Sequence, residues 1–159
     1  MIRTALTDGY ITDTWTKLSN RWDIQNKLSD VWGIGKHYWY PLTESNKEDL
    51  ISFESSYIIN KEKLSNIKSI LLQMGVTEIY EFRENGLLYK IQKINDYNFW
   101  DSDDYFWNNE CFWFNDAMDF IIYISHEETL TFGGEIIIKE LKNYWHDWNE
   151  HLKWDTKNK

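Results

Sequence analysis

The sequence has few of the residues that tie a fold together covalently or stiffen its backbone. Its 159 residues include one cysteine, Cys111, and one proline, Pro41. A single cysteine excludes a disulfide within the chain and any thiolate cluster for a metal ion. No segment reaches the roughly 18 apolar residues of a membrane-spanning helix, and residues 1–8 lack the apolar stretch of a secretory signal. These absences predict a soluble cytoplasmic protein with no membrane contact.

Positive charge is also missing from a long part of the chain. No Lys or Arg lies between Ile94 and Ile138, whereas ten Asp and Glu residues do. The net charge is −9 (17 basic and 26 acidic residues), so the rest of the chain holds 17 basic against 16 acidic residues. The acidity is therefore local. It disfavours nucleic acid as a partner, because phosphate would be repelled.

Two interpretations of this acidic stretch remain open. Charge runs are usually solvated faces with a few carboxylates that cap turns. Alternatively, the stretch forms a surface that attracts a cationic partner, because charges around aromatic anchors provide both steering and affinity.

The residues that are abundant predict one folded domain. Hydrophobic residues make up 42 % of the chain and charged residues 27 %, a composition that excludes a disordered or low-complexity protein. The length suffices for one core but not for two, so we expect a single domain over residues 1–159. Aromatic residues reach 18 %, including ten Trp.

The clearest structural signals lie between residues 120 and 152. The apolar run 120–124 predicts a central strand buried on both faces. Residues 125–128 form a polar turn, and the alternation in 129–132 predicts a half-buried second strand. Gly133-Gly134 ends that strand and opens an amphipathic helix over 135–152.

A second hairpin is predicted around Asn85-Gly86, which favours a two-residue turn between strands 77–84 and 87–94. That turn fixes the register: it pairs Phe82 with Tyr89, Tyr80 with Ile91 and Glu81 with Lys90. The four apolar residues would then share one face of the hairpin.

Helix signals lie before this hairpin. Asn60 is suited to cap a helix over 61–74, and Gly75 supplies its left-handed end. Residues 12–32 have helical spacing in two sets, which indicates one bent helix or two short ones around Asn20. A strand is predicted at 36–40 and a short helix near residue 46, while 49–59 is compatible with helix or strand.

Together these elements predict an α+β fold: one domain with a mostly antiparallel sheet, whose two hairpins pack against amphipathic helices near 61–74 and 135–152. The residues expected to be buried are Tyr80, Phe82, Tyr89, Ile91, Ile122, Ile124, Leu141, Trp145 and Trp148.

The segment 95–119 has no sustained period of either kind. Nine of the eighteen residues from Tyr97 to Phe114 are aromatic, and long connections in compact domains are often functional. We therefore predict that the aromatic, acidic region from Asp96 to Glu128 binds a basic protein. The predicted anchors are Trp100, Tyr105 and Trp107; the steering charges are Asp101, Asp103, Asp104 and Glu110; and His126, Glu127 and Glu128 adjoin them.

Metal and cofactor motifs are incomplete. Asp101-x-Asp103-Asp104 begins like a calcium loop, but Phe106 and Phe112 stand where the EF-hand pattern needs Gly and Glu. His126-Glu127-Glu128 lacks the second histidine of a zinc protease, and no phosphate loop surrounds Gly133-Gly134. We expect no metal and no cofactor.

Catalysis remains the alternative function. A small hydrolase could use a carboxylate pair such as Asp103 and Glu127, or His126 as a base. No set of residues forms a specific catalytic motif, so no catalytic residue is assigned. Cys111 is expected to be a small buried hydrophobe, and His146 and His151 to face solvent.

A family resemblance rests on three stretches before a Trp-rich last helix: Tyr-Trp-Tyr-Pro-Leu at 38–42, residues 79–86, and residues 123–134. They resemble small bacterial cytoplasmic proteins. The size, acidity and α+β pattern are similar to those of immunity proteins that neutralise polymorphic or contact-dependent toxins. The resemblance implies a non-enzyme that blocks a basic toxin, often a nuclease, by covering its active face. It carries over no individual site residue.

Overall fold

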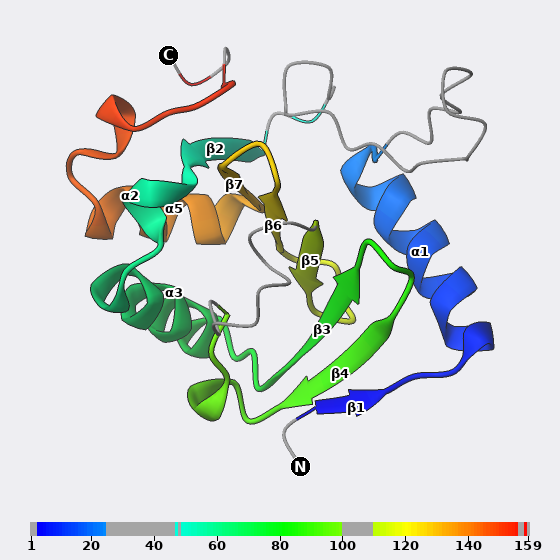
Figure 1. The fold of residues 1–159 in the computed structure, drawn as a ribbon. Coiled ribbons are helices and arrows are strands. Elements are labelled where there is room, and N and C mark those ends of the chain that lie inside the picture. Colours follow the sequence, from blue (N-terminus) through cyan, green and yellow to red (C-terminus); the bar gives the residue numbers. More distant parts are fainter. Residues whose placement is uncertain (1–2, 25–46, 48, 100–109, 156–157, 159) are drawn as a thin grey trace, which may run out of the picture.

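The computed structural model describes residues 3–24, 47, 49–99, 110–155 and 158. Its elements are β1 (Arg3–Ala5), α1 (Asp8–Trp22), β2 (Leu50–Glu54), α2 (Ser55–Ile58), α3 (Lys61–Gln73), β3 (Glu78–Arg83), β4 (Leu88–Gln92), η2 (Ile94–Asp96), β5 (Cys111–Phe114), β6 (Ile121–Ser125), β7 (Thr129–Gly133), α5 (Glu135–Tyr144) and η3 (Trp148–Glu150) (Figure 1). The strands form one seven-stranded sheet in the order β1-β4-β3-β5-β6-β7-β2, with antiparallel neighbours throughout. This confirms the predicted α+β fold.

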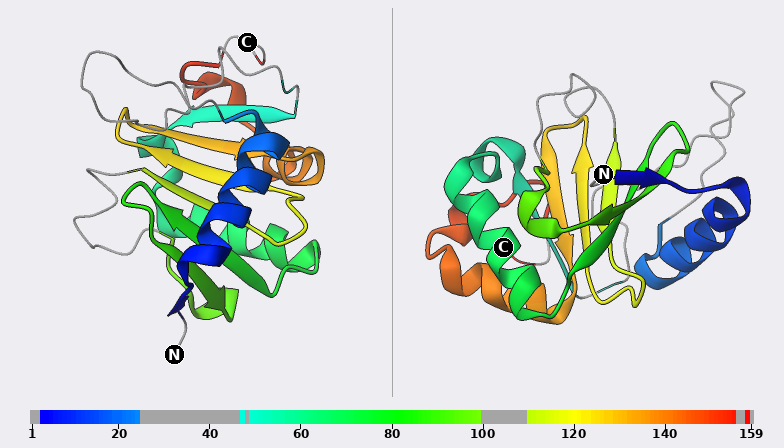
Figure 2. Two further views of the ribbon diagram at one scale, coloured as in Figure 1. Left: turned by 90° about the vertical axis from the view of Figure 1, so that its right-hand side faces the viewer. Right: turned by 90° about the horizontal axis from the view of Figure 1, so that it is seen from below.

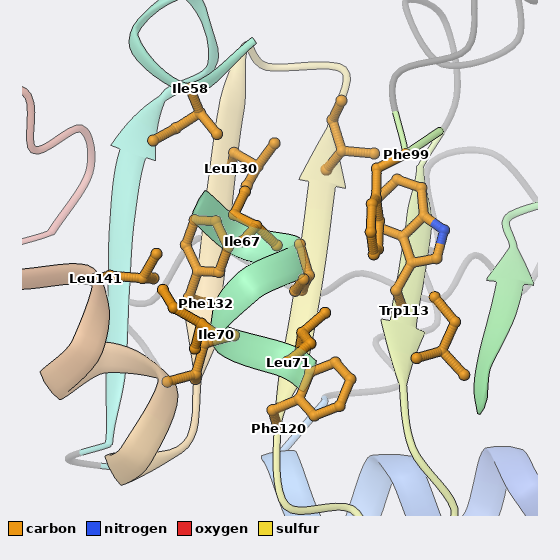
Figure 3. Close-up of a cluster of buried hydrophobic side chains, with 14 of the residues drawn as sticks. Ile58, Ile67, Ile70, Leu71, Phe99, Trp113, Phe120, Leu130, Phe132 and Leu141 are labelled. Atoms are coloured by element: carbon orange, nitrogen blue, oxygen red, sulfur yellow. The ribbon is translucent and has the colours of Figure 1, made fainter. Parts of the chain in front are cut away.

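Helices cover both faces of the sheet. α2, α3 and α5 lie on one face and α1 crosses the other (Figure 2). The larger hydrophobic cluster joins α3 and α5 to the sheet, as the side chains of Ile67, Leu141 and Phe132 illustrate (Figure 3). The smaller cluster, beneath α1, includes Leu18 and Trp22.

β6 is the buried, central strand that its sequence predicts. Ile122 and Ile124 belong to the larger cluster, whereas Ile121 and Tyr123 belong to the smaller one, so the strand is buried on both faces. β7 differs from the prediction of a half-buried strand, because it is buried along its whole length. The Thr131 hydroxyl, on its polar face, donates to Ser52 Oγ at 3.1 Å, and this bond allows the threonine to be buried.

The predicted register of the β3–β4 hairpin is wrong by one residue. Arg83 N donates to Leu87 O and Gly86 N to Arg83 O, both at 2.9 Å, so the loop has three residues. Gly86 has φ +83°, which is typical of a bulge that follows a type I turn. Phe82 therefore pairs with Leu88, and Glu81 with Tyr89.

The shift moves side chains to the opposite face of the sheet. Tyr80 and Phe82 lie against α1, whereas Tyr89 and Ile91 lie on the side of α3 and α5. Glu81 does not pair with Lys90 but is buried, and the Lys90 ammonium instead meets Glu78 at 2.7 Å.

α3 confirms both of its predicted ends. Asn60 accepts a hydrogen bond from Lys63 N at 2.9 Å, and Gly75 adopts φ +77° just beyond the last turn. The last helix is shorter than predicted: α5 ends at Tyr144, not at residue 152. Trp145 leaves the helical conformation and packs, 2 % exposed, against Phe53 and Phe132. Beyond Tyr144, apolar residues therefore still recur every three or four positions, but the chain there forms a turn and η3 and not a helix.

The remaining expectations have mixed outcomes. α1 begins before the predicted residue 12 and ends at Trp22, where Asp23 is left-handed. Residues 49–59, compatible with either state, contain both a strand, β2, and a short helix, α2. The strand at 36–40 and the helix near 46 lie outside the described residues. Phe82, Ile91, Ile122, Ile124, Leu141 and Trp145 are buried as predicted, whereas Tyr80, Tyr89 and Trp148 are half-buried.

Candidate functional site

Carboxylates line one end of the sheet, where strands end and turns connect them. We call this end, which is not an outer strand, the acidic edge. β3 and β2 end there, β5 begins there, and the β6–β7 turn closes there, as the antiparallel registers require. The left view of Figure 2 shows the β3–β4 and β6–β7 turns on the same side. The acidic edge consists of Glu54, Glu84, Glu110, Glu127 and Glu128.

Backbone bonds between neighbouring strands hold these residues in place. Glu84 N donates to Glu110 O at 2.9 Å, and Glu110 N approaches Glu84 Oε2 at 3.4 Å. At the other end of the row, Ser55 N donates to Glu128 O at 2.9 Å. The spacing of the carboxylates is therefore set by the sheet.

Glu110 is the buried member of the acidic edge. Its side chain is 10 % exposed and its Oε1 lies 3.2 Å from His126 Nδ1. Burial raises the pKa of the Glu110 carboxyl, and Glu84 and Glu127 raise it further, whereas Tyr123 and His126 act in the opposite direction. Burial, followed by the Glu110 carboxylate, raises the pKa of Tyr123 well above its usual value. Glu110 and His126 thus form a partly dehydrated acid–imidazole pair.

The β6–β7 turn presents the remaining predicted residues to solvent. Glu127 N donates to Ser125 Oγ at 3.1 Å, and Glu128 has φ +58°, a left-handed conformation that is uncommon outside glycine. The Glu128 carboxylate is 82 % exposed and lies 3.4 Å from Lys153 Nζ. This turn therefore exposes carboxylates on a backbone that the hairpin fixes.

Some of the residues predicted from sequence meet here and others cannot be placed. Glu110, His126, Glu127 and Glu128 lie on the acidic edge. Trp100, Asp101, Asp103, Asp104, Tyr105 and Trp107 lie outside the described residues. The sequence analysis does not identify Glu54 or Glu84 as site residues, although it predicts a turn at Asn85-Gly86, directly after Glu84. Placing them on this edge needs the strand order, which local patterns do not contain.

His151 also differs from its prediction as a solvent-facing residue. Its ring stacks on Tyr57 at 3.8 Å, and its Nδ1 lies 2.8 Å from Glu54 Oε1. Its Nε2 lies 3.5 Å from Asp147 Oδ2. The half-buried histidine thus joins the C-terminal segment to the β2 end of the acidic edge.

A buried ion network lies elsewhere on β3. Glu81, which is 0 % exposed, accepts hydrogen bonds from Arg3 Nη2 and Tyr97 Oη at 2.5 Å each and from Arg83 Nε. Trp113 Nε1 donates to Tyr97 Oη at 2.9 Å. Cys111 is buried, as predicted, and burial raises the pKa of its thiol well above the usual value. This thiol is therefore protonated at neutral pH and is a poor nucleophile.

Three hollows lined by described residues lie away from the acid–imidazole pair. One of about 690 Å³ is lined by Arg21, Asp49, Asp119 and Glu135, among others. Asp119 precedes β6 and Glu135 follows β7, so this hollow lies at the opposite end of the sheet. Within the described ranges, no group of three His, Cys, Asp or Glu side chains could hold a metal ion. Nor is any described helix long and apolar enough to cross a bilayer.

Comparisons of this chain with protein-family models, curated proteins and solved structures find no match.

Proposed function

We propose that this chain is an immunity-type inhibitor that binds a basic protein, such as a toxin domain, through the acidic edge. The observation that supports this most directly is the convergence of Glu54, Glu84, Glu110, Glu127 and Glu128 on one end of the sheet. The proposed interface also includes the aromatic and acidic residues of 100–109, which precede Glu110 in the chain.

Little positive charge offsets this edge among the described residues. Lys153 meets the exposed Glu128, and the nearest arginine along the chain, Arg83, is buried against Glu81. The local field is therefore negative and would speed the encounter with a cationic protein. It would slow the approach of nucleic acid, which we do not expect to be a partner.

The proposed interface separates steering from anchoring. Exposed carboxylates such as Glu84 and Glu127 are each worth about 0.2–1 kcal/mol and act mainly on the association rate. Aromatic anchors act on dissociation, and losing a central one costs about 2 kcal/mol or more. Trp100, Tyr105 and Trp107 are the anchors proposed from sequence.

The test of this function is direct inhibition. A basic protein encoded next to this gene is purified and titrated with the chain, while binding and the toxic activity are both measured. We expect saturable binding and a stoichiometric loss of activity. A neighbouring basic toxin that stays fully active in excess of the chain would contradict the proposal.

The second candidate is the small hydrolase, and the observation that favours it is the raised pKa of Glu110 beside His126. A carboxyl whose pKa is raised, next to an imidazole, is suited to general acid–base chemistry. Glu110→Gln should then abolish hydrolysis of ester and glycoside substrates. If wild-type protein and variant are equally inactive, the inhibitor proposal is favoured.

A further inference from the structure

The C-terminal segment closes the outer edge of β2. Glu54 N donates to His151 O at 3.0 Å, and Lys153 N donates to Ser52 O at 3.1 Å. Ser52 N donates to Asp155 Oδ2 at 3.0 Å, and Asp155 itself is fully buried. The two neighbours of Trp154, Lys153 and Asp155, are therefore both hydrogen-bonded to the backbone of Ser52.

These hydrogen bonds on either side of Trp154 hold it in an unusual backbone conformation with an exposed side chain. Its φ is +59°, in a left-handed region that bulky side chains rarely adopt. Its side chain is 52 % exposed, although an indole is normally among the most buried groups. Strained residues persist only where their surroundings impose the conformation, and they cluster at functional sites. The flanking bonds supply that constraint here.

The turn that carries Trp154 adjoins the acidic edge. The preceding residue, Lys153, meets the Glu128 carboxylate at 3.4 Å. The segment's first backbone bond to β2 is to Glu54, whose carboxylate also contacts His151 at 2.8 Å. An exposed aromatic group on a fixed backbone thus lies beside Ser52, two residues along β2 from Glu54, and directly follows the lysine that meets Glu128.

We propose that Trp154 is the aromatic anchor at the β2 end of the acidic edge and that it takes an arginine side chain of the basic partner. This inference rests on the proposed function and adds a residue and a ligand chemistry to it. A guanidinium can stack on the indole face while the carboxylates of the edge attract its charge. Trp and Arg are also the residues most enriched at the energetic centres of interfaces. A second copy of this chain is disfavoured as the occupant, because each copy carries a net charge of −9.

The test uses hexa-arginine as the probe and the indole N–H resonances as the readout in NMR titrations. Trp154→Leu removes the π face but keeps an apolar side chain and the same backbone strain. Trp154→Tyr keeps an aromatic ring. Ile136→Ala, at a residue 58 % exposed at the start of α5, is the control at the opposite end of the sheet.

We expect saturable shifts of the Trp154 resonance. Affinity should fall about two- to five-fold in Trp154→Leu, as for an exposed cation–π contact, but less than two-fold in Trp154→Tyr and in the control. Wild-type affinity in Trp154→Leu, or an unmoved Trp154 resonance, would overturn the proposal.

A second variant separates this inference from the proposed function. Glu127→Lys with Glu128→Lys tests the acidic edge without changing Trp154. If this double variant loses affinity while Trp154→Leu does not, the anchor is wrong and the acidic edge stands. If only Trp154→Leu loses affinity, the anchor stands and the role of the carboxylates is wrong. If hexa-arginine shows no saturable binding, both are contradicted.

Discussion

Glu81 shows how a single residue can determine whether the interior of this protein is stable. Its carboxylate is fully buried and accepts hydrogen bonds from Arg3, Arg83 and Tyr97. The carboxylate offsets part of the charge of the two guanidinium groups and ties the arginine of β1 to β3. Removing the carboxylate would leave two guanidinium groups without their shared partner.

Glu81→Ala should therefore lower the free energy of unfolding by about 3–5 kcal/mol, the usual cost of breaking a buried ion pair. The matched control on the same strand is Glu78→Ala, whose partially exposed pair with Lys90 is worth about 1 kcal/mol or less. Urea unfolding of both variants measures the difference. Equal losses would show that the Glu81 network does not stabilise the fold.

Glu110 makes the stability depend on pH. Its pKa in the folded protein is raised by burial, so the folded state retains this proton over a range in which the unfolded chain has lost it. The contribution of Glu110 to the free energy of unfolding is fully present below the pKa that this carboxyl has in the unfolded chain. It is lost as pH rises through the pKa of the folded state. Glu110→Gln removes this dependence.

Unfolding midpoints measured from acidic to neutral pH should show that Glu110→Gln gains stability relative to wild type as pH rises. A difference between Glu110→Gln and wild type that stays constant over this pH range would contradict the raised pKa.

At the scale of elements, sequence patterns correctly predicted the features that depend on residues close together in the chain. The Asn60 cap and Gly75 define α3, and the unbroken apolar run predicts β6. The β3–β4 register could not be predicted correctly, because Asn85-Gly86 is compatible with both a two- and a three-residue loop. β2 was ambiguous, because both faces and both edges of that strand have partners that lie far away in the sequence.

Gly134 connects β7 to α5 at a point where no side chain fits. Its φ is +115°, and a Cβ there would lie 2.4 Å from Asp119 O. Gly134→Ala should cost about 2 kcal/mol or more, from backbone strain together with this clash. Gly9 in α1 has free space around its Cβ position, so Gly9→Ala should be neutral or stabilise by up to about 1 kcal/mol. Thermal unfolding of the pair checks this; a destabilised Gly9→Ala or a stable Gly134→Ala would contradict it.

At the scale of the whole molecule, the order of the strands creates the candidate site. The sequence located the acidic stretch, and Glu110, His126, Glu127 and Glu128 lie on one edge. It could not locate Glu54 or Glu84 there, because antiparallel pairing brings together strand ends that are far apart along the chain. Nor did it find Trp154, whose exposure follows from the bonds of its neighbours to Ser52.

The central claim, that the acidic edge binds a basic protein, is tested most directly by the association rate at two salt concentrations. The edge variant combines Glu84→Lys, Glu127→Lys and Glu128→Lys. The control makes the same change in net charge elsewhere, with Glu62→Lys, Glu78→Lys and Asp116→Lys, which are all exposed residues away from the edge. We predict that the edge variant associates more slowly with the basic partner and loses most of the salt dependence, whereas the control retains both. Equal association rates and salt slopes for the edge variant, the control and wild type would contradict the account.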